Sequence, residues 1–308
     1  MDPEPMPVIA WVESPLQLVG VAEWAAAHRR RVPIAGRLTP HMAETSDELV
    51  ARGALFGRRE PYWGIPWNLL ARHGHWLIGD GFSGQFRLAV AVLRPRRITF
   101  LDDGANALAF ADAVTDARPF ARPGVDERAR SRVVVPFARE RLLRCARAGG
   151  IDFFTAFEFG ASRVGQLADR GIAVRRHAFE WTRRTARAFI TTTHGRILLG
   201  SARPGDGLMP LAEYLDWVRR EAADAPLTYL PHRRETDEQL RMVAAIPGVV
   251  LSRPALPVEM LLAGAIERLE ILTLPSSTTT TLPLVLRGSR SAIRTETAAR
   301  VAVDGGAA

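Results

Sequence analysis

Residues 75–104 read HWLIGDGFSGQFRLAVAVLRPRRITFLDDG, and this stretch decides the fold. The apolar run at 75–78 ends in a Gly-Asp turn and predicts a strand. A helix is expected over 84–93, closed by Pro95. The β-branched and aromatic run at 97–101 predicts a second strand, which ends in Asp-Asp-Gly. Strand, helix and strand with short connections form a βαβ unit, so a parallel sheet is favoured.

The same alternation continues on both sides of this unit. Residues 8–12 predict a strand that runs into Ser14-Pro15-Leu16-Gln17, where a capping serine, a proline at the first helical position and a glutamine three residues after the serine indicate a helix start. Further strands are expected at 32–35, 151–157, 196–201, 227–230, 249–251 and 269–274, and further helices at 42–52, 139–148, 211–221, 236–245 and 258–262. Charged and Thr-rich sequence at 175–195 indicates a linker.

This order of elements predicts an α/β protein with two Rossmann-like doubly wound domains facing a central cleft. We place the domains at residues 1–185 and 186–308. In open parallel sheets, ligands bind beyond the carboxyl ends of the strands. The polar clusters that directly follow a predicted strand are Glu13-Ser14, Asp102-Asp103-Gly104, Gly200-Ser201, His232 and Ser276-Ser277. Their shared position favours an enzyme.

Composition excludes several classes of protein. Hydrophobic residues make up 47% and charged residues 24%, as in soluble globular proteins. No secretion signal and no membrane-spanning run is evident, so a cytoplasmic protein is expected. Its single cysteine, Cys145, excludes an internal disulfide. The net charge of +8 comes from arginine, with no lysine in the chain, and fits either an anionic ligand or a simple bias in codon usage. The arginines are scattered as pairs, which disfavours nucleic acid.

The Asp102-Asp103 pair is a candidate general base. Close, partly buried carboxylates favour protonation of one another, so one of them can accept a proton near neutral pH. The alternative is an ordinary acidic turn or helix cap.

Two further clusters suit a phosphate. His232, flanked by Arg233, can protonate or hydrogen-bond a leaving phosphate while the guanidinium balances its charge; the alternative is a surface histidine in a loop. Ser276 and Ser277 can offer hydroxyls and free N–H groups at a helix start, although simple capping explains most such runs. Ser14 and Gln17 carry the same ambiguity.

Other chemistries lack their motifs. The chain has no Gly-rich phosphate loop ending in Lys-Ser/Thr, no G-x-S-x-G elbow and no His/Cys zinc spacing. No metal site and no cofactor are therefore expected. Trp63, Trp67 and Trp76 either pack in the core, which we favour, or form a patch on the acceptor side or for a peripheral membrane contact.

Taken in order, these motifs resemble those of the bacterial sialyltransferases and polysialyltransferases, over about residues 7–286. The family has a strand running into a Ser/Thr-Pro-Leu-Gln helix start, an acidic-acidic-Gly motif, a His-Pro motif and a late Ser pair. The matching segments are Glu13 to Leu18, Asp102-Asp103-Gly104, His232 with Glu235, Pro257-Val258-Glu259 and Ser276-Ser277. Arg233 replaces the proline after the histidine, which puts the aim of the imidazole in doubt.

The resemblance implies a GT-B fold and an inverting, metal-independent transfer from a CMP-activated sugar. It implies Asp102 as the base with Asp103 in support, although either could act, and His232 as the group on the departing phosphate. Ser276 and Ser277 would bind that phosphate and Glu259 the ribose, while Gly200 and Ser201 would let the donor approach the backbone. The acceptor would lie against residues 1–185 and the donor against 186–308.

The principal hypothesis is thus transfer of sialic acid or a related nonulosonate from a CMP-sugar to a glycan or glycolipid, at the inner face of the cell membrane or in the cytoplasm. A rival keeps the fold with CMP-Kdo or a UDP-sugar as donor. A non-catalytic nucleotide-sugar-binding relative is the third hypothesis, because of the substitution at Arg233.

Overall fold

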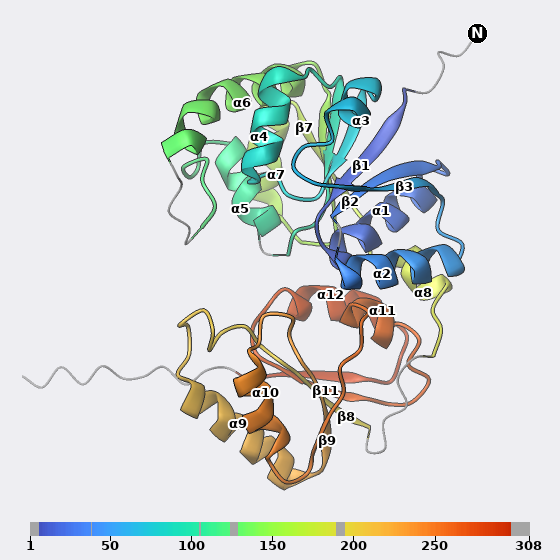
Figure 1. Cartoon of the computed structure of the whole chain (residues 1–308), viewed down its shortest axis with the longest axis vertical. Helices are drawn as coiled ribbons and strands as arrows, with labels where there is room; N and C mark the ends of the chain where they lie inside the picture. The colour runs from blue at the N-terminus through green and yellow to red at the C-terminus, as the bar shows by residue number, and fades with distance from the viewer. Residues whose placement is uncertain (1–5, 38, 105, 124–128, 189–194, 297–308) are drawn as a thin grey trace, which may run out of the picture. The chain divides into compact units, whose positions relative to one another are not determined.

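The computed structural model describes residues 6–37, 39–104, 106–123, 129–188 and 195–296, with side chains in the fourth range from residue 134. The chain forms two compact units (Figure 1). The first comprises residues 1–187 together with 255–264, and the second comprises 188–254 and 265–308. The predicted boundary at residue 185 had assigned 255–264 to the second domain, whereas the structure groups this segment with the first.

A seven-stranded parallel sheet forms the centre of the first unit, in the order β3-β2-β1-β4-β5-β6-β7. Its strands are β1 (Val8–Val12), β2 (Val32–Arg37), β3 (Phe56–Tyr62), β4 (His75–Ile78), β5 (Arg97–Phe100), β6 (Ile151–Thr155) and β7 (Ile172–Arg176). The chain winds outward from β1 through β2 and β3, then returns to β4 on the other side of β1. The switch point of this doubly wound sheet therefore lies between β1 and β4.

Helices connect these strands. They are α1 (Pro15–Ala27), α2 (Pro40–Ala51), α3 (Trp67–Arg72), α4 (Gly84–Val92), α5 (Asn106–Val114), α6 (Ala129–Arg147), α7 (Gly160–Asp169) and α8 (Glu180–Arg184), with α11 (Val258–Leu262) from the later segment. Ser14 caps α1 as predicted, because its side chain accepts the N–H of Gln17. The helix therefore begins directly after β1, and Gln17 in its first turn lies at the carboxyl end of the sheet.

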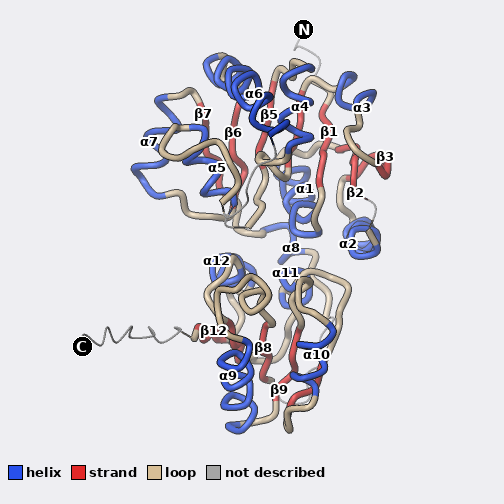
Figure 2. Tube along the Cα trace, turned by 60° about the vertical axis from the view of Figure 1, so that its left-hand side comes forward, coloured by secondary structure: helices blue, strands red, loops and turns tan. Residues whose placement is uncertain are grey.

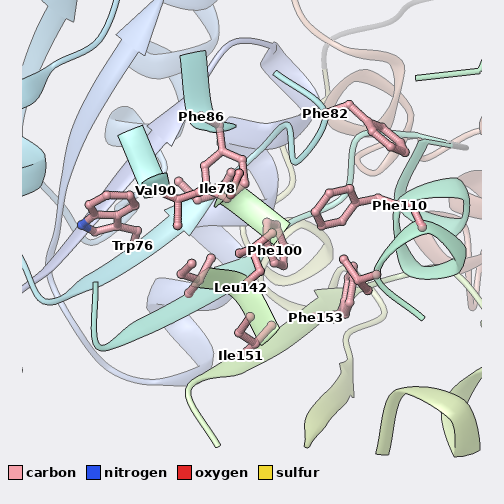
Figure 3. Close-up of a cluster of buried hydrophobic side chains, with 14 of the residues drawn as sticks. Trp76, Ile78, Phe82, Phe86, Val90, Phe100, Phe110, Leu142, Ile151 and Phe153 are labelled. Carbon is pink, nitrogen blue, oxygen red and sulfur yellow. The ribbon is translucent and has the colours of Figure 1, made fainter. Parts of the chain in front are cut away.

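A large aromatic core fills one face of this sheet. It unites strand residues such as Trp76, Phe100 and Phe153 with Phe86 of α4 and Leu142 of α6 (Figure 3). Successive strand residues point to opposite faces, so His75 and Leu77 of β4 face away from this core, and the His75 ring packs on Trp24 of α1. Helices thus cover both faces of the first sheet.

The second unit repeats the plan of a parallel sheet flanked by helices (Figure 2). Its five parallel strands lie in the order β10-β9-β8-β11-β12. Its strands are β8 (Arg196–Leu199), β9 (Leu227–Leu230), β10 (Val249–Leu251), β11 (Glu270–Thr273) and β12 (Ala292–Thr295), and its helices are α9 (Leu211–Asp224), α10 (Asp237–Ala244) and α12 (Thr278–Val285). Here the switch point lies between β8 and β11. The predicted α/β class, with two Rossmann-like doubly wound sheets, is confirmed.

The tryptophans divide between the core and the surface. Trp76 is buried, as expected, whereas Trp63 is 83% exposed and Trp67 38% exposed. Core packing was therefore the wrong expectation for Trp63 and Trp67. Among the described residues, no helix combines the length and the hydropathy needed to cross a membrane.

Candidate functional site

Acidic and amide side chains gather at the carboxyl ends of β1, β4 and β5, three adjacent strands beside the first switch point. Asp103 follows β5, and its two carboxylate oxygens accept hydrogen bonds from amide groups. Gln17 Nε2 donates to Oδ1 at 2.8 Å, and Asn106 Nδ2 donates to Oδ2 at 3.0 Å. The end of β5 is thereby tied to the first turns of α1 and α5.

Gln17 is itself held in place by the backbone. Its Oε1 accepts the N–H of Glu13 at 2.7 Å, which leaves the amide nitrogen to donate to Asp103. Gly79, after β4, makes room for it, since a Cβ at this glycine would overlap Gln17 Oε1. Gln17 therefore lies in the first turn of the helix and orients Asp103. Contact of Ser14 or Gln17 with a ligand stays a prediction.

Asp80, after β4, is a member of this site that the sequence reasoning missed. Its side chain is 12% exposed. Oδ1 accepts the N–H of Phe82 at 2.9 Å and Oδ2 pairs with Arg122, whose Nη1 lies 4.0 Å from Asp103 Oδ2. Burial, and then the charge of Asp103, raise the pKa of Asp80 to about 6, although Arg122 opposes the shift. The missed signal was a Gly-Asp pair directly after a predicted strand.

Asp80 and Asp103 line one small hollow, about large enough for a single water. Its other walls are mainly apolar and come from Gly79, Gly81, Phe82, Phe100, Leu101, Asn106, Ala107, Phe110 and Phe153. A Cβ at Gly81 would lie about 2.5 Å from the Phe110 ring, so the glycine permits this close packing. Two carboxylates thus meet in a largely apolar setting.

Asp102 does not line this hollow. It is 4% exposed, and its carboxylate accepts the hydroxyl of Thr155 and the N–H of Ala156, the latter at 2.7 Å. His177 Nε2 lies 3.4 Å from its Oδ2. These contacts tie the end of β5 to the residues that follow β6 and β7. The geometry therefore does not support the predicted role of Asp102 as the base.

Glu23, His177 and Glu180 form a group that could in principle hold a metal ion, within the part of the chain that the structure describes. Glu23, however, already accepts the N–H groups of Trp181 at 3.0 Å and Thr182 at 2.7 Å. Glu180 accepts the N–H of Ala178 at 2.9 Å. The carboxylates therefore serve the start of α8, and independence from metal stays a prediction.

In the second unit, Glu235 organises the loop that carries His232. Its carboxylate accepts the N–H of His232 at 2.6 Å, the amide of Gln239 at 2.6 Å and the hydroxyl of Tyr229. Burial raises the pKa of Glu235 to about 7. A Cβ at Gly200 would overlap Glu235 Oε2 and lie 2.6 Å from His232 N. Packing against this loop therefore explains the glycine at position 200, and approach of a donor to its backbone stays a prediction.

His232 is poised to donate a hydrogen bond. Burial, and then the nearby charge of Arg233, lower its pKa, so the imidazole is neutral at pH 7. Nδ1 accepts the N–H of Arg234 at 3.2 Å, which leaves the proton on Nε2. Stabilisation of an anion by Nε2–H therefore fits the geometry better than protonation by an imidazolium. The side chain of Arg233 is exposed.

Ser276 and Ser277 precede α12, after β11 at the second switch point. Ser277 occupies the capping position without a capping hydrogen bond from its side chain, and Ser276 Oγ lies 2.7 Å from Thr278 Oγ1. In the neighbouring loop after β8, Ser201 Oγ accepts the N–H of Arg203 at 3.2 Å, and Arg203 Nη1 donates to Pro275 O at 3.4 Å. The structure thus brings the two serine loops together, at a helix N-terminus suited to an anion.

Glu259, the residue expected to bind the ribose, belongs to the first unit. It is buried in the first turn of α11, in the segment that belongs to the first unit. Its predicted contact with a ribose stays a prediction.

Comparison with known proteins bears on the fold. No family model and no curated protein matches the chain. A putative UDP-N-acetylglucosamine 2-epimerase from Listeria monocytogenes has a TM-score of 0.55 at 13% identity, over 91% of this chain and 77% of that one. The UDP-GlcNAc 2-epimerase from Neisseria meningitidis, bound to UDP-GlcNAc, has a TM-score of 0.54 at 11% identity, over 91% and 81%. At these identities the likeness shows the fold alone, and this chain has the GT-B type of two-domain α/β fold.

Proposed function

We propose that the chain is a glycosyltransferase that moves a sugar from a nucleotide-activated donor to a hydroxyl group of an acceptor. The observation that carries the proposal is the pair of carboxylates, Asp80 and Asp103, which line one hollow at the carboxyl ends of neighbouring strands. Ligands of open parallel sheets bind at this edge, beside the switch point. A carboxylate there can take the proton of a sugar hydroxyl.

In the proposed reaction the acceptor O–H bond breaks, and its proton passes to a carboxylate of the first unit. The acceptor oxygen forms the new bond to the anomeric carbon from the face opposite the leaving group, so the configuration inverts. The bond between that carbon and the phosphate oxygen breaks, and its electron pair leaves with the phosphate. Nε2–H of His232 and the N-terminus of α12, with Ser276 and Ser277, stabilise the developing negative charge.

The donor is the finer part of the proposal. We favour a CMP-activated nonulosonate such as CMP-sialic acid, because the order of the motifs from Glu13 to Ser277 resembles that of the bacterial sialyltransferases. CMP-Kdo would use the same phosphate seat. A UDP-sugar is the alternative favoured by the fold, since the Neisseria meningitidis epimerase of this fold binds UDP-GlcNAc. The acceptor is then a glycan or glycolipid.

A thermal-shift screen of CMP, UDP, GDP and ADP tests the donor class directly. A nucleotide bound at 100 times its Kd adds about 2.7 kcal/mol to the unfolding free energy, because it binds only the folded state. Selective stabilisation by CMP supports the CMP-sugar donor, and selective stabilisation by UDP supports the alternative.

Transfer is then measured with the matching labelled nucleotide sugar and a mixture of glycan and glycolipid acceptors, with and without a metal chelator. Labelled glycan, formed equally with the chelator, supports the proposal. Formation of an epimerised nucleotide sugar without acceptor would show that the protein is an epimerase and not a transferase. Nucleotide binding with neither product would indicate a non-catalytic relative.

A further inference from the structure

We infer that Asp80, rather than Asp102 or Asp103, receives the proton of the acceptor hydroxyl, and that Asp103 and Arg122 set its charge. This inference rests on the proposed transferase function and names the base within it. Neither Asp80 nor Arg122 belongs to a motif that the resemblance supplied. The assignment comes from the different contacts of Asp80, Asp102 and Asp103 at the ends of β4 and β5.

The hydrogen bonds separate the roles of these carboxylates. Asp102 is buried with its oxygens turned to Thr155 and Ala156, so a sugar hydroxyl cannot replace them without disrupting the end of β5. Asp103 also lines the hollow, and both of its oxygens accept hydrogen bonds from neutral side-chain amides, those of Gln17 and Asn106. Asp80 lines the hollow with one neutral donor, the N–H of Phe82, and one charged partner, Arg122.

Among the described residues, three charged groups and one backbone N–H act on Asp80. Asp103 at the end of β5 and Glu13 at the end of β1 favour its protonated form, as does burial, which is the largest influence. Arg122 and the N–H of Phe82 favour the carboxylate. The resulting pKa of about 6 leaves Asp80 mostly ionised at pH 7 and still basic enough to accept a proton, the balance that general-base catalysis requires.

Proton transfer to Asp80 also has a compensating electrostatic consequence. When the proton arrives, Asp80 becomes neutral and the guanidinium of Arg122 is left with Asp103, whose Oδ2 lies 4.0 Å from Nη1. The positive charge therefore keeps a partner throughout the step. Arg122 does not line the hollow, so we assign it as a positioning residue that favours the ionised form of Asp80.

The first test needs no substrate. Protein labelled with ¹³C at the aspartate carboxyl carbons is titrated by NMR as wild type, Asp80→Asn, Asp103→Asn and Arg122→Gln. We expect one carboxyl near pKa 6 that disappears in Asp80→Asn, titrates about one unit lower in Asp103→Asn and about one unit higher in Arg122→Gln. A resonance near 6 that survives in Asp80→Asn would overturn the inference.

The second test measures transfer. Asp80→Asn should lower kcat about 100-fold or more with nucleotide affinity unchanged. Arg122→Gln should move the acidic limb of the pH–rate profile to higher pH, because it raises the pKa of Asp80. Asp112→Asn is the matched control, since Asp112 also pairs with an arginine, Arg163 at 2.6 Å, but lies outside the hollow. This variant should keep the wild-type rate.

The two tests separate the inference from the proposed function. If wild type transfers no sugar while the titration behaves as expected, the transferase proposal fails and the electrostatics of Asp80 stand. If wild type transfers and Asp80→Asn keeps its rate, the transferase proposal stands and Asp80 is not the base.

Discussion

Replacing Asp102 by alanine should unfold the first unit more easily without removing the chemistry. Asp102 is buried at the end of β5 and accepts two donors that have no access to water once it is gone, the hydroxyl of Thr155 and the N–H of Ala156. His177 loses the nearby Oδ2 at the same time. In the acidic motif, Asp102 would therefore stabilise the fold, whereas Asp103 would act in catalysis through its effect on Asp80.

The cost follows from these contacts. A buried donor left without a partner costs about 1–3 kcal/mol, and the substitution leaves two such donors, the hydroxyl of Thr155 and the N–H of Ala156. We therefore expect Asp102→Ala to lower the unfolding free energy of the first unit by about 3–5 kcal/mol. For a unit of this size, that corresponds to about 10 °C in Tm. Asp102→Asn, which retains one acceptor oxygen, should lose about half as much.

Urea unfolding of protein labelled with 5-fluorotryptophan suits this measurement. All tryptophans except Trp217 lie in the first unit, so their ¹⁹F resonances follow the two units separately. With a urea dependence of about 2 kcal/mol per M, the midpoint of the first unit should fall by about 2 M in Asp102→Ala.

Activity decides between the two roles. At a temperature where Asp102→Asn is folded, kcat should stay within about tenfold of wild type. A loss of about 100-fold or more, with the midpoint unchanged, would refute this reasoning and return Asp102 to the proton-transfer step.

Three further predictions concern the second unit. Gly200→Ala should destabilise it by about 1–3 kcal/mol, measured by the Trp217 resonance in urea, because the new Cβ overlaps Glu235 Oε2; an unchanged midpoint would contradict the packing role. The folded-state pKa of Glu235, about 7, exceeds its ordinary value of 4.5, so the folded state binds more protons between these values and loses stability as the pH rises through them. The resulting loss of unfolding free energy, about 3 kcal/mol between pH 4.5 and 8, should be absent in Glu235→Gln. An equal loss in both proteins would exclude Glu235 as its source. Ser276→Ala with Ser277→Ala should weaken nucleotide binding about tenfold by calorimetry and leave Asp80 titrating as in wild type; unchanged affinity would remove the α12 phosphate seat.

The strands that the sequence did not predict all lie at sheet edges. The unit from β4 to β5 and the start of α1 were predicted because their strands are central and read as apolar runs. β3, β7 and β12 were missed, and all three lie at sheet edges. Edge strands are half exposed and carry charges, as in the Gly57–Tyr62 part of β3, so the apolar periodicity that reveals a strand is lost.

The sequence predicted which strand ends carry the candidate site, but not which side chains meet there. Strand-end position identified Asp103, His232 and the serine loops. Which of Asp102 and Asp103 lines the hollow depends on their hydrogen bonds to α1, α5 and the residues after β6, and these contacts span up to 86 residues of sequence. Asp80 is a candidate base only because it lies beside Asp103 and Arg122 in the fold. No local sequence pattern predicts these contacts.

The most direct test of the account is a crystal structure of the chain with the nucleotide that the thermal-shift screen selects, ideally as an unreactive donor analogue. We predict the phosphate at the N-terminus of α12, within hydrogen-bond reach of His232 Nε2, and the anomeric carbon facing the hollow lined by Asp80 and Asp103. A nucleotide bound away from α12, or an anomeric carbon with neither carboxylate near enough to reach an attacking hydroxyl, would contradict it.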